Sequence, residues 1–411
     1  MRQSEPKYLR RERAGCQALS SRRQVFRPEA RDFLLNGRVF FRGRGGHNRT
    51  PCSADMAWHL FLCDADRAVH LKNELVVFGA PQPVTAAGAQ SILIDAAAFD
   101  AACDASGQIP ALAFARQVLP AARTLPGSSI GEIARAAAQA IIENCDDLEQ
   151  WRFHTLRSEG ETAPGPNRLK LVRTEIEATL KKRRRRLLKT LCEDSDATGT
   201  FALVQLYLES AERAYLSISV IAPKQQPFVW RRCLSPWPGG VWHGSENREP
   251  PSRAYRKLEE ALTQFPWISS SGIRAREVCV DLGASPGGWS WVALARGARV
   301  IAVDRSPLRE DLMGHPQLTF IQGDAFRFEP EQPVDWLICD VIAFPERTIE
   351  LLSKWLEKKW CRNFCVTVKF RGSGDYTVLS ELKTMLNKSS RDFAVRRLTE
   401  NKNEVTAFGC V

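Results

Sequence analysis

A strand that runs directly into a glycine turn is the feature that most constrains this chain. Residues 278–289 read VCVDLGASPGGW, a short apolar run with an acid near its end that continues into three glycines. Glycines here allow backbone N–H groups at a helix start to approach a ligand closely, because no β-carbon intervenes. The alternative is an ordinary strand-to-helix turn without a ligand. The spacing differs from G-x-G-x-x-G, so a nicotinamide dinucleotide is the weaker prediction.

Four successive apolar runs end at or close to an acid. The runs are residues 278–282, 298–303, 318–321 and 334–339, and the acids are Asp281, Asp304, Asp324 and Asp340. A single acid in such a place is most often a helix cap or a solvated loop residue. In an open α/β sheet, however, the carboxyl ends of the strands face one crevice. Together the four acids therefore predict a pocket of negative potential.

This pocket suits a nucleoside that carries a positive charge. Asp304 lies about 20 residues beyond the glycine turn, where a doubly wound sheet offers a carboxylate to ribose hydroxyls. Several carboxylates would repel the pyrophosphate of a dinucleotide, whereas they attract a sulfonium centre. The residues therefore predict S-adenosyl-L-methionine as the cofactor.

A fifth apolar run, residues 364–368, ends at Lys369, which the same sheet would deliver into the crevice. A lysine acts as a base only after it has lost its proton. Desolvation or a neighbouring cation favours that loss, and a neighbouring carboxylate opposes it. Lys257 is the candidate cation, since it lies in an expected helix that starts within residues 252–260.

These residues resemble the FtsJ-like 2′-O-ribose RNA methyltransferases, whose signature is a Lys-Asp-Lys-Glu tetrad on a Rossmann-like sheet. The resemblance covers residues 252–411 and implies an α/β methyltransferase sheet of seven strands with the last one antiparallel. The positions that match the tetrad are Lys257, Asp340, Lys369 and Glu404. The positions that match the family's cofactor-binding residues are Ser252, Gly283, Ser285, Pro286, Gly287, Gly288, Trp289, Asp304, Asp324 and Asp340.

The resemblance also implies a reaction, the methylation of a ribose 2′-hydroxyl in RNA without a metal. Lys369 is then the base, and Asp340 holds it in register with the methyl donor. Lys257 contacts phosphate or the hydroxyl, and its positive charge lowers the pKa of Lys369. Glu404 orients the two lysines. Within the family the likeness is strongest to members that act on a cytidine of bacterial 23S ribosomal RNA, and we expect a substrate that precedes full subunit assembly.

Two alternatives to this reaction remain open. The four tetrad residues can instead form a structural salt-bridge network. The protein can also be a catalytically silent relative that binds S-adenosylmethionine or RNA and acts in ribosome assembly. One local departure concerns the target-binding loop, because Phe370-Arg371-Gly372-Ser373 lacks the proline that the resemblance leads us to expect after Lys369.

The rest of the chain divides into four expected regions. Residues 1–55 contain twelve Arg and one Lys against three Glu and two Asp, a net charge of +8. This segment is either a disordered RNA-binding tail or an artefact of a misassigned start, with Met56 as the true first residue. Residues 56–113 form a small α/β region, and residues 114–223 resemble the THUMP RNA-binding domain. A linker rich in Pro, Gly and Trp follows at residues 224–251, where packing of the tryptophans is favoured over stacking on RNA bases.

A cluster of six basic residues, 181–186, is expected on a helix of the THUMP-like region. This pattern predicts a protein surface that binds the phosphates of RNA. The alternative is a solvated helix face without a ligand. Twelve cysteines occur without a C-x-x-C pair, so neither a zinc site nor a disulfide framework is indicated, and a reducing cytoplasm is expected. No uncharged apolar stretch is long enough to cross a bilayer, and no apolar segment typical of a secretory signal follows the N-terminus.

Overall fold

The structure is a computed structural model that describes residues 57–77, 84–85, 90–106, 111–161, 163–192, 201–221, 233–244, 246–265, 268, 272–372 and 376–411. All described residues belong to one compact unit. The predictions for residues 1–55, for Met56 and for residues 224–232 of the linker lie outside the described residues.

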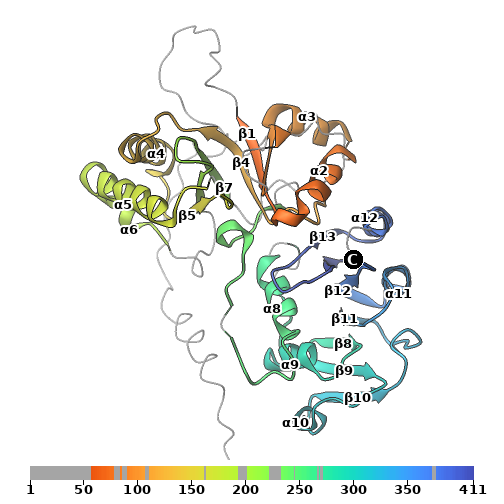
Figure 1. Cartoon of the computed structure of the whole chain (residues 1–411). Helices are drawn as coiled ribbons and strands as arrows, with labels where there is room; N and C mark the ends of the chain where they lie inside the picture. Colours follow the sequence, from red (N-terminus) through yellow and green to blue (C-terminus); the bar gives the residue numbers. More distant parts are fainter. Residues whose placement is uncertain are drawn as a thin grey trace, which may run out of the picture. The chain divides into compact units, whose positions relative to one another are not determined.

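The described residues form two seven-stranded sheets (Figure 1). The first has the order β2-β3-β1-β4-β7-β6-β5. Its strands are β1 (Trp58–Leu62), β2 (Val84–Thr85), β3 (Ser91–Asp95), β4 (Gln117–Thr124), β5 (Trp151–Arg157), β6 (Phe201–Leu208) and β7 (Ala214–Ile221). The helices in this part of the chain are η3 (Ala65–Arg67), α2 (Ala68–Val77), α3 (Ala96–Ser106), α4 (Ile130–Cys145), α5 (Pro166–Arg183) and α6 (Arg185–Lys189).

The first sheet is continuous across the expected boundary at residue 113. Strand β1 pairs antiparallel with β3 on one side and with β4 on the other, so strands from residues 56–113 and 114–223 share one sheet. The helix expected near residues 130–142 and the strands expected at residues 201–208 and 215–221 are confirmed as α4, β6 and β7. The division at residue 113 and the THUMP-like identity of residues 114–223 stay predictions.

The second sheet has the order β10-β9-β8-β11-β12-β14-β13. Strands β10, β9, β8, β11 and β12 are parallel to one another, and β14 is antiparallel to both β12 and β13. The predicted seven strands with an antiparallel last strand are therefore confirmed. The strands are β8 (Val278–Leu282), β9 (Arg299–Asp304), β10 (Leu318–Gln322), β11 (Val334–Cys339), β12 (Cys361–Lys369), β13 (Asp392–Arg396) and β14 (Glu404–Cys410).

Helices cover both faces of the second sheet, which explains its nearly continuous apolar strands. Alternate residues of β11 point to opposite faces: Trp336 packs with the residues of α8 and α9, and Leu337 packs with those of α11 and α12. The helices are α8 (Tyr255–Gln264), α9 (Gly288–Ala295), α10 (Glu310–Met313), α11 (Pro345–Glu357) and α12 (Val378–Ser389). This two-sided core fixes the strand ends that carry the candidate site.

The described part of the linker, 233–244, contains the short helix η4 (Pro238–Gly240). Trp242 is buried, its backbone N–H donates to Thr399 Oγ1, and the guanidinium of Arg256 lies 4.8 Å from the centre of its ring. Packing was the expected use of the linker tryptophans, and this is confirmed for Trp242. Among the helices that the structure describes, none has both the length and the apolarity needed to cross a membrane.

The core against the α11–α12 face yields a stability prediction. Leu382 of α12 is fully buried, and Leu382→Ala should lower the free energy of unfolding by about 2–5 kcal/mol, because the side chain leaves a cavity. Urea denaturation measures the loss. Leu171→Ala is the matched control, since Leu171 is 53% exposed on α5 and its removal should cost less than about 0.5 kcal/mol. Equal losses for the two variants would contradict the packing described here.

Candidate active site at the strand ends

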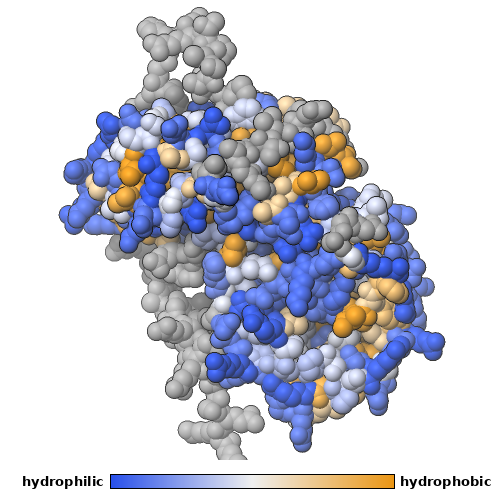
Figure 2. Space-filling view, viewed as in Figure 1, coloured by the Kyte–Doolittle hydropathy of each residue, from blue (hydrophilic) through white to orange (hydrophobic). Residues whose placement is uncertain are grey.

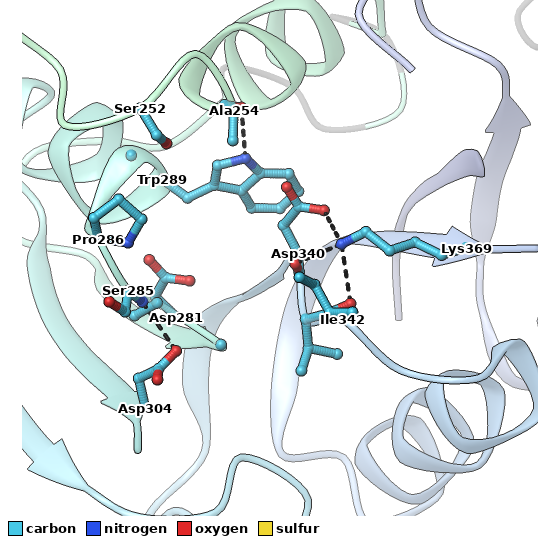
Figure 3. Close-up of a pocket in the computed structure, with 14 residues that line it drawn as sticks. Ser252, Ala254, Asp281, Ser285, Pro286, Trp289, Asp304, Asp340, Ile342 and Lys369 are labelled. Atoms are coloured by element: carbon cyan, nitrogen blue, oxygen red, sulfur yellow. Dashed lines mark hydrogen bonds and ion pairs between the residues drawn. The ribbon is translucent and has the colours of Figure 1, made fainter. Parts of the chain in front are cut away.

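A cavity of about 430 Å³ lies at the carboxyl ends of β8, β9, β11 and β12 (Figure 3). Its size is in the range of small-molecule pockets. In the close-up, Lys369 extends from the end of β12 toward Asp340, while Ser285 and Asp304 lie on the opposite side of the cavity. The lining residues are Ser252, Ala254, Asp281, Gly283, Ala284, Ser285, Pro286, Gly288, Trp289, Asp304, Asp340, Val341, Ile342 and Lys369.

The glycine turn lines one side of the cavity, and two of its lining positions, Gly283 and Gly288, have no side chain. Gly283 has φ +76°, and a β-carbon there would stand 2.9 Å from the Cα of Val341. A β-carbon on Gly288 would stand 2.5 Å from Ser252 Oγ. Both positions therefore require glycine, the first for its backbone conformation as well as for space. The turn lines the cavity, and the close approach of its backbone to a ligand stays a prediction.

Asp304 is fixed by the same turn. Its Oδ2 accepts a hydrogen bond from the backbone N–H of Ser285 at 3.0 Å, and its Oδ1 accepts one from the N–H of Ser306 at 2.9 Å. A carboxylate offers about four acceptor sites, so these two bonds leave capacity for ligand hydroxyls. On the other side of the cavity, Trp289 Nε1 donates to the carbonyl of Ala254 at 2.8 Å, which joins the start of α9 to the segment before α8.

Asp281 lies beneath the cavity and is almost completely buried. Burial raises the pKa of its carboxyl to about 7, although the hydrogen bond that Ser290 Oγ donates at 2.7 Å opposes the shift. The carboxylates of Asp340 and Asp304 raise the pKa further. Near neutral pH this acid is therefore poised between its two forms.

Asp340 joins the two lysines of the predicted tetrad. Lys257 Nζ lies 3.1 Å from Asp340 Oδ2, and Lys369 Nζ lies 2.8 Å from Asp340 Oδ1. Glu404 completes the group, because its Oε1 lies 2.5 Å from Lys257 Nζ. Strand register explains the last position: Glu404 of β14 stands opposite Lys369 of β12. The four residues that the sequence placed together do meet.

The two lysines have different surroundings. Burial would lower the pKa of Lys257, but the carboxylates of Asp340 and Glu404 outweigh this effect and raise its pKa above the usual value. Lys257 is therefore charged. Lys369 Nζ also donates to the backbone carbonyls of Asp340 at 2.7 Å and Val341 at 3.0 Å. With the Asp340 carboxylate these are three acceptors, one for each N–H of an ammonium group.

Four of the residues suggested by the sequence do not line the cavity. Lys257 pairs with Asp340, which lines the cavity, and Glu404 pairs with Lys257. Gly287 has φ +113° and forms the start of α9. Asp324 accepts from the backbone N–H of Phe326 and pairs with Arg305 at 2.7 Å, and these contacts lower its pKa. The cofactor roles of Gly287 and Asp324 stay predictions.

The cavity also contains residues that the sequence did not assign to the site. They are Ala254, Ala284, Val341 and Ile342. Asp281 was one of the four acids expected to line a pocket at the strand ends, and it does line the cavity. Val341 and Ile342 directly follow Asp340, so their position after a strand end was available from the sequence. Their neighbours across the cavity come from distant segments.

The donor set fits S-adenosylmethionine. Gly283 and Gly288 line the cavity without a side chain of their own. Asp281, Asp304 and Asp340 give the lining a negative potential, which suits a sulfonium cation. Asp304 has acceptor capacity left for hydroxyl groups. The same carboxylates would disfavour a ligand that carries phosphates.

Residues 250–406 match the family model of the FtsJ-like methyltransferases. The resemblance stated from the tetrad is therefore confirmed for this part of the chain. A curated protein named ribosomal RNA large subunit methyltransferase M, from Laribacter hongkongensis, is 33% identical over 215 residues, which is 50% of this chain and 58% of the relative. The protein of the same name from Pseudomonas putida strain W619 is 37% identical over 166 residues, 39% of this chain and 45% of the relative.

The chain spans about half the length of the curated relatives that it matches. Among solved structures, TrmN from Thermus thermophilus is 15% identical and aligns with 86% of this chain and 99% of its own, with a TM-score of 0.32. The strand order of the second sheet is sufficient to define its fold.

The raised pKa of Asp281 predicts a pH dependence of stability. Between about pH 4 and pH 7 the folded protein holds a proton on Asp281 that the unfolded chain releases. The contribution of this group to the free energy of unfolding should therefore fall by roughly 2–4 kcal/mol as the pH rises through that window. Asp281→Asn removes the titration, so the variant should gain stability relative to the wild type over the same range.

Urea denaturation of both proteins across this window provides the test. Asp311→Asn is a control of opposite sign, because Arg309 lowers the pKa of Asp311 and its contribution is lost at low pH. A stability difference between Asp281→Asn and the wild type that does not change with pH would contradict the raised pKa.

Proposed function

We propose that this protein is an S-adenosylmethionine-dependent RNA methyltransferase that modifies a ribose 2′-hydroxyl, with a cytidine of 23S ribosomal RNA, before full subunit assembly, as its substrate. The observation that carries the proposal is the pairing of two lysines, Lys257 and Lys369, with Asp340, because Asp340 and Lys369 line a cavity that also holds Asp281 and Asp304. The match to FtsJ-like methyltransferases and the names of the curated relatives support the reaction and the substrate.

The cofactor is held, in this proposal, by the residues of the cavity. The backbone of the turn from Gly283 to Gly288 lies against it, Asp304 binds its ribose, and Asp340 lies beside its charged centre. When bound, it supplies a methyl carbon that leaves sulfur as the ribose 2′-oxygen bonds to it, and the hydroxyl proton then needs an acceptor.

Lys369 is the proposed proton acceptor. Its Nζ is fixed by the Asp340 carboxylate and by two backbone carbonyls, so its position at the cavity does not depend on the substrate. To serve as a base it must first give up one of its three protons. Lys257 favours this step, because its positive charge faces the same carboxylate. Glu404 in turn holds Lys257 in place. General-base catalysis of this kind contributes about 10²–10⁴-fold to a rate.

The basic cluster of residues 181–186 supplies a second contact with RNA in this proposal. Its residues are exposed at the end of α5 and the start of α6, while Leu180 and Leu187 anchor the two helices in the core. Arg184 is already paired with Asp146 at 3.5 Å, whereas Arg185 and Arg186 project into solvent on α6. Exposed arginines of this density suit a phosphate backbone.

The ten cysteines that the structure describes are all free thiols, which supports a cytoplasmic location.

Replacement of Lys369 separates the base from a structural salt bridge. Lys369→Arg keeps the charge and the contacts with Asp340 but cannot lose a proton, so methyl transfer to 23S rRNA should fall by about 10²–10⁴-fold. Cofactor binding by calorimetry should be unchanged. Lys388→Ala, at an exposed position of α12, is the control and should keep full activity. Full activity of Lys369→Arg would exclude the base role, and a wild type that binds RNA and cofactor without transfer would favour the catalytically silent alternative.

Loss of arginines from the basic cluster should change the salt dependence of RNA binding. Replacing both Arg185 and Arg186 by Ala should lower the slope of log K against log salt by about 2, one for each lost phosphate contact. Filter binding with protein-free rRNA fragments over a range of salt concentrations measures the slope. Arg135→Ala, exposed on α4, is the matched control. An unchanged slope in the double variant would mean that the cluster is only a solvated helix face.

A further inference from the structure

The loop that joins β11 to α11 exposes apolar side chains beside the cavity. Ile342 is 90% exposed and Phe344 is 54% exposed, although both lie within four residues of Asp340. Phe344 is the only Phe, Trp or Tyr with an exposed side chain in the part of the chain that the structure describes. Figure 2 shows a small hydrophobic patch on a mostly hydrophilic surface, at the position where β11 and α11 lie in Figure 1. Neither side chain contributes to the core, so their exposure needs another explanation.

The loop is fastened to the catalytic lysine. Lys369 Nζ donates to the carbonyls of Asp340 and Val341, and the next residue, Ile342, lines the cavity next to them. Figure 3 shows Ile342 directly below the ammonium group of Lys369. Four residues of extended chain reach at most about 14 Å, which limits the distance from Asp340 to Phe344. The loop therefore lies within reach of a molecule that presents a hydroxyl to Lys369.

A cation lies on one face of the exposed ring. The guanidinium carbon of Arg371 is 3.5 Å from the centre of the Phe344 ring, and Arg371 itself is exposed two residues after Lys369. Nearby on α11, the exposed Arg347 stacks in the same way on Phe326, at 4.1 Å. Planar cations and aromatic rings beside a reactive group are the combination on which proteins stack bases of single-stranded RNA, with the positive charge also drawing phosphates.

We propose that Ile342, Phe344 and Arg371 form a stacking platform for an unpaired base of the RNA strand, next to the ribose that Lys369 serves. The platform rests on the proposed function, because it assigns the substrate-binding side of the same site. Single-stranded RNA is the occupant favoured by the cationic rim and by the attachment of the loop to Lys369. A protein partner has no comparable reason to occupy a position over the reactive lysine.

Substitutions at Phe344 test the platform, because they separate the effect of an aromatic ring from the effect of a hydrophobic side chain. In steady-state methyl transfer to protein-free 23S rRNA, Phe344→Ala should raise the KM for RNA about tenfold, because the RNA base loses the aromatic ring on which it stacks. The cofactor affinity should not change. Phe344→Trp should bind RNA at least as well as the wild type, whereas Phe344→Leu should behave like Phe344→Ala. Arg371→Ala should also weaken RNA binding.

Controls keep this test distinct from that of the proposed function. Val69→Ala removes another exposed apolar side chain, 68% exposed on α2, and should leave the KM for RNA unchanged. A KM in Phe344→Ala equal to that of an active wild type, or a Leu variant as good as Trp, would overturn the platform. If the wild type transfers no methyl group, binding of an unstructured oligoribonucleotide replaces KM as the readout. Weaker binding by Phe344→Ala would then support the platform even though the proposed reaction had failed.

Discussion

The carboxylate of Asp340 is the point at which two lysine side chains and the ends of two strands meet. It stands at the end of β11, accepts from Lys369 at the end of β12, and pairs with Lys257 of α8. The negative charge of Asp340 attracts both ammonium groups. Lys369 also donates to the backbone carbonyls of Asp340 and Val341, and these bonds hold the start of the loop between β11 and α11. The cavity, the methyl donor that fits it and the exposed loop beyond it all depend on this single group.

Burial sets the chemistry of the site as much as proximity does. Asp281 and Asp340 are carboxylates at the ends of neighbouring strands, yet they have different surroundings. Asp281 is enclosed and partly protonated near neutral pH, and only Ser290 is hydrogen-bonded to its side chain. Asp340 is paired with two lysines. The two acids therefore have different partners although they follow neighbouring strands, and the raised pKa of Asp281 lets the charge beneath the cavity change near neutral pH.

The sequence predicted the parts of the fold that are encoded locally. Apolar runs, the glycine turn and the acids after the strands were sufficient for the sheet from β8 to β12 and for Asp340 and Lys369 at one edge of it. The resemblance to the FtsJ-like methyltransferases added Glu404 and completed the tetrad with Lys257. Two features escaped it, because they depend on contacts between distant segments. The pairing of β1 with β4 places strands from residues 56–113 and 114–223 in one sheet, and the sequence did not predict this pairing. The contact of Asp324 with Arg305 lies outside the cavity, although Asp324 follows its strand as the other acids do.

In the proposed reaction, the three hydrogen bonds of Lys369 couple proton transfer to the conformation of the loop. An uncharged lysine has only two N–H groups, so its lone pair becomes available only when one of the three acceptors is given up. If a backbone carbonyl is the one released, the segment that carries Ile342 and Phe344 loses a tether just as the nitrogen becomes basic. Reprotonation at the end of the reaction would restore that tether. Each turnover would then loosen and tighten the surface on which the product rests.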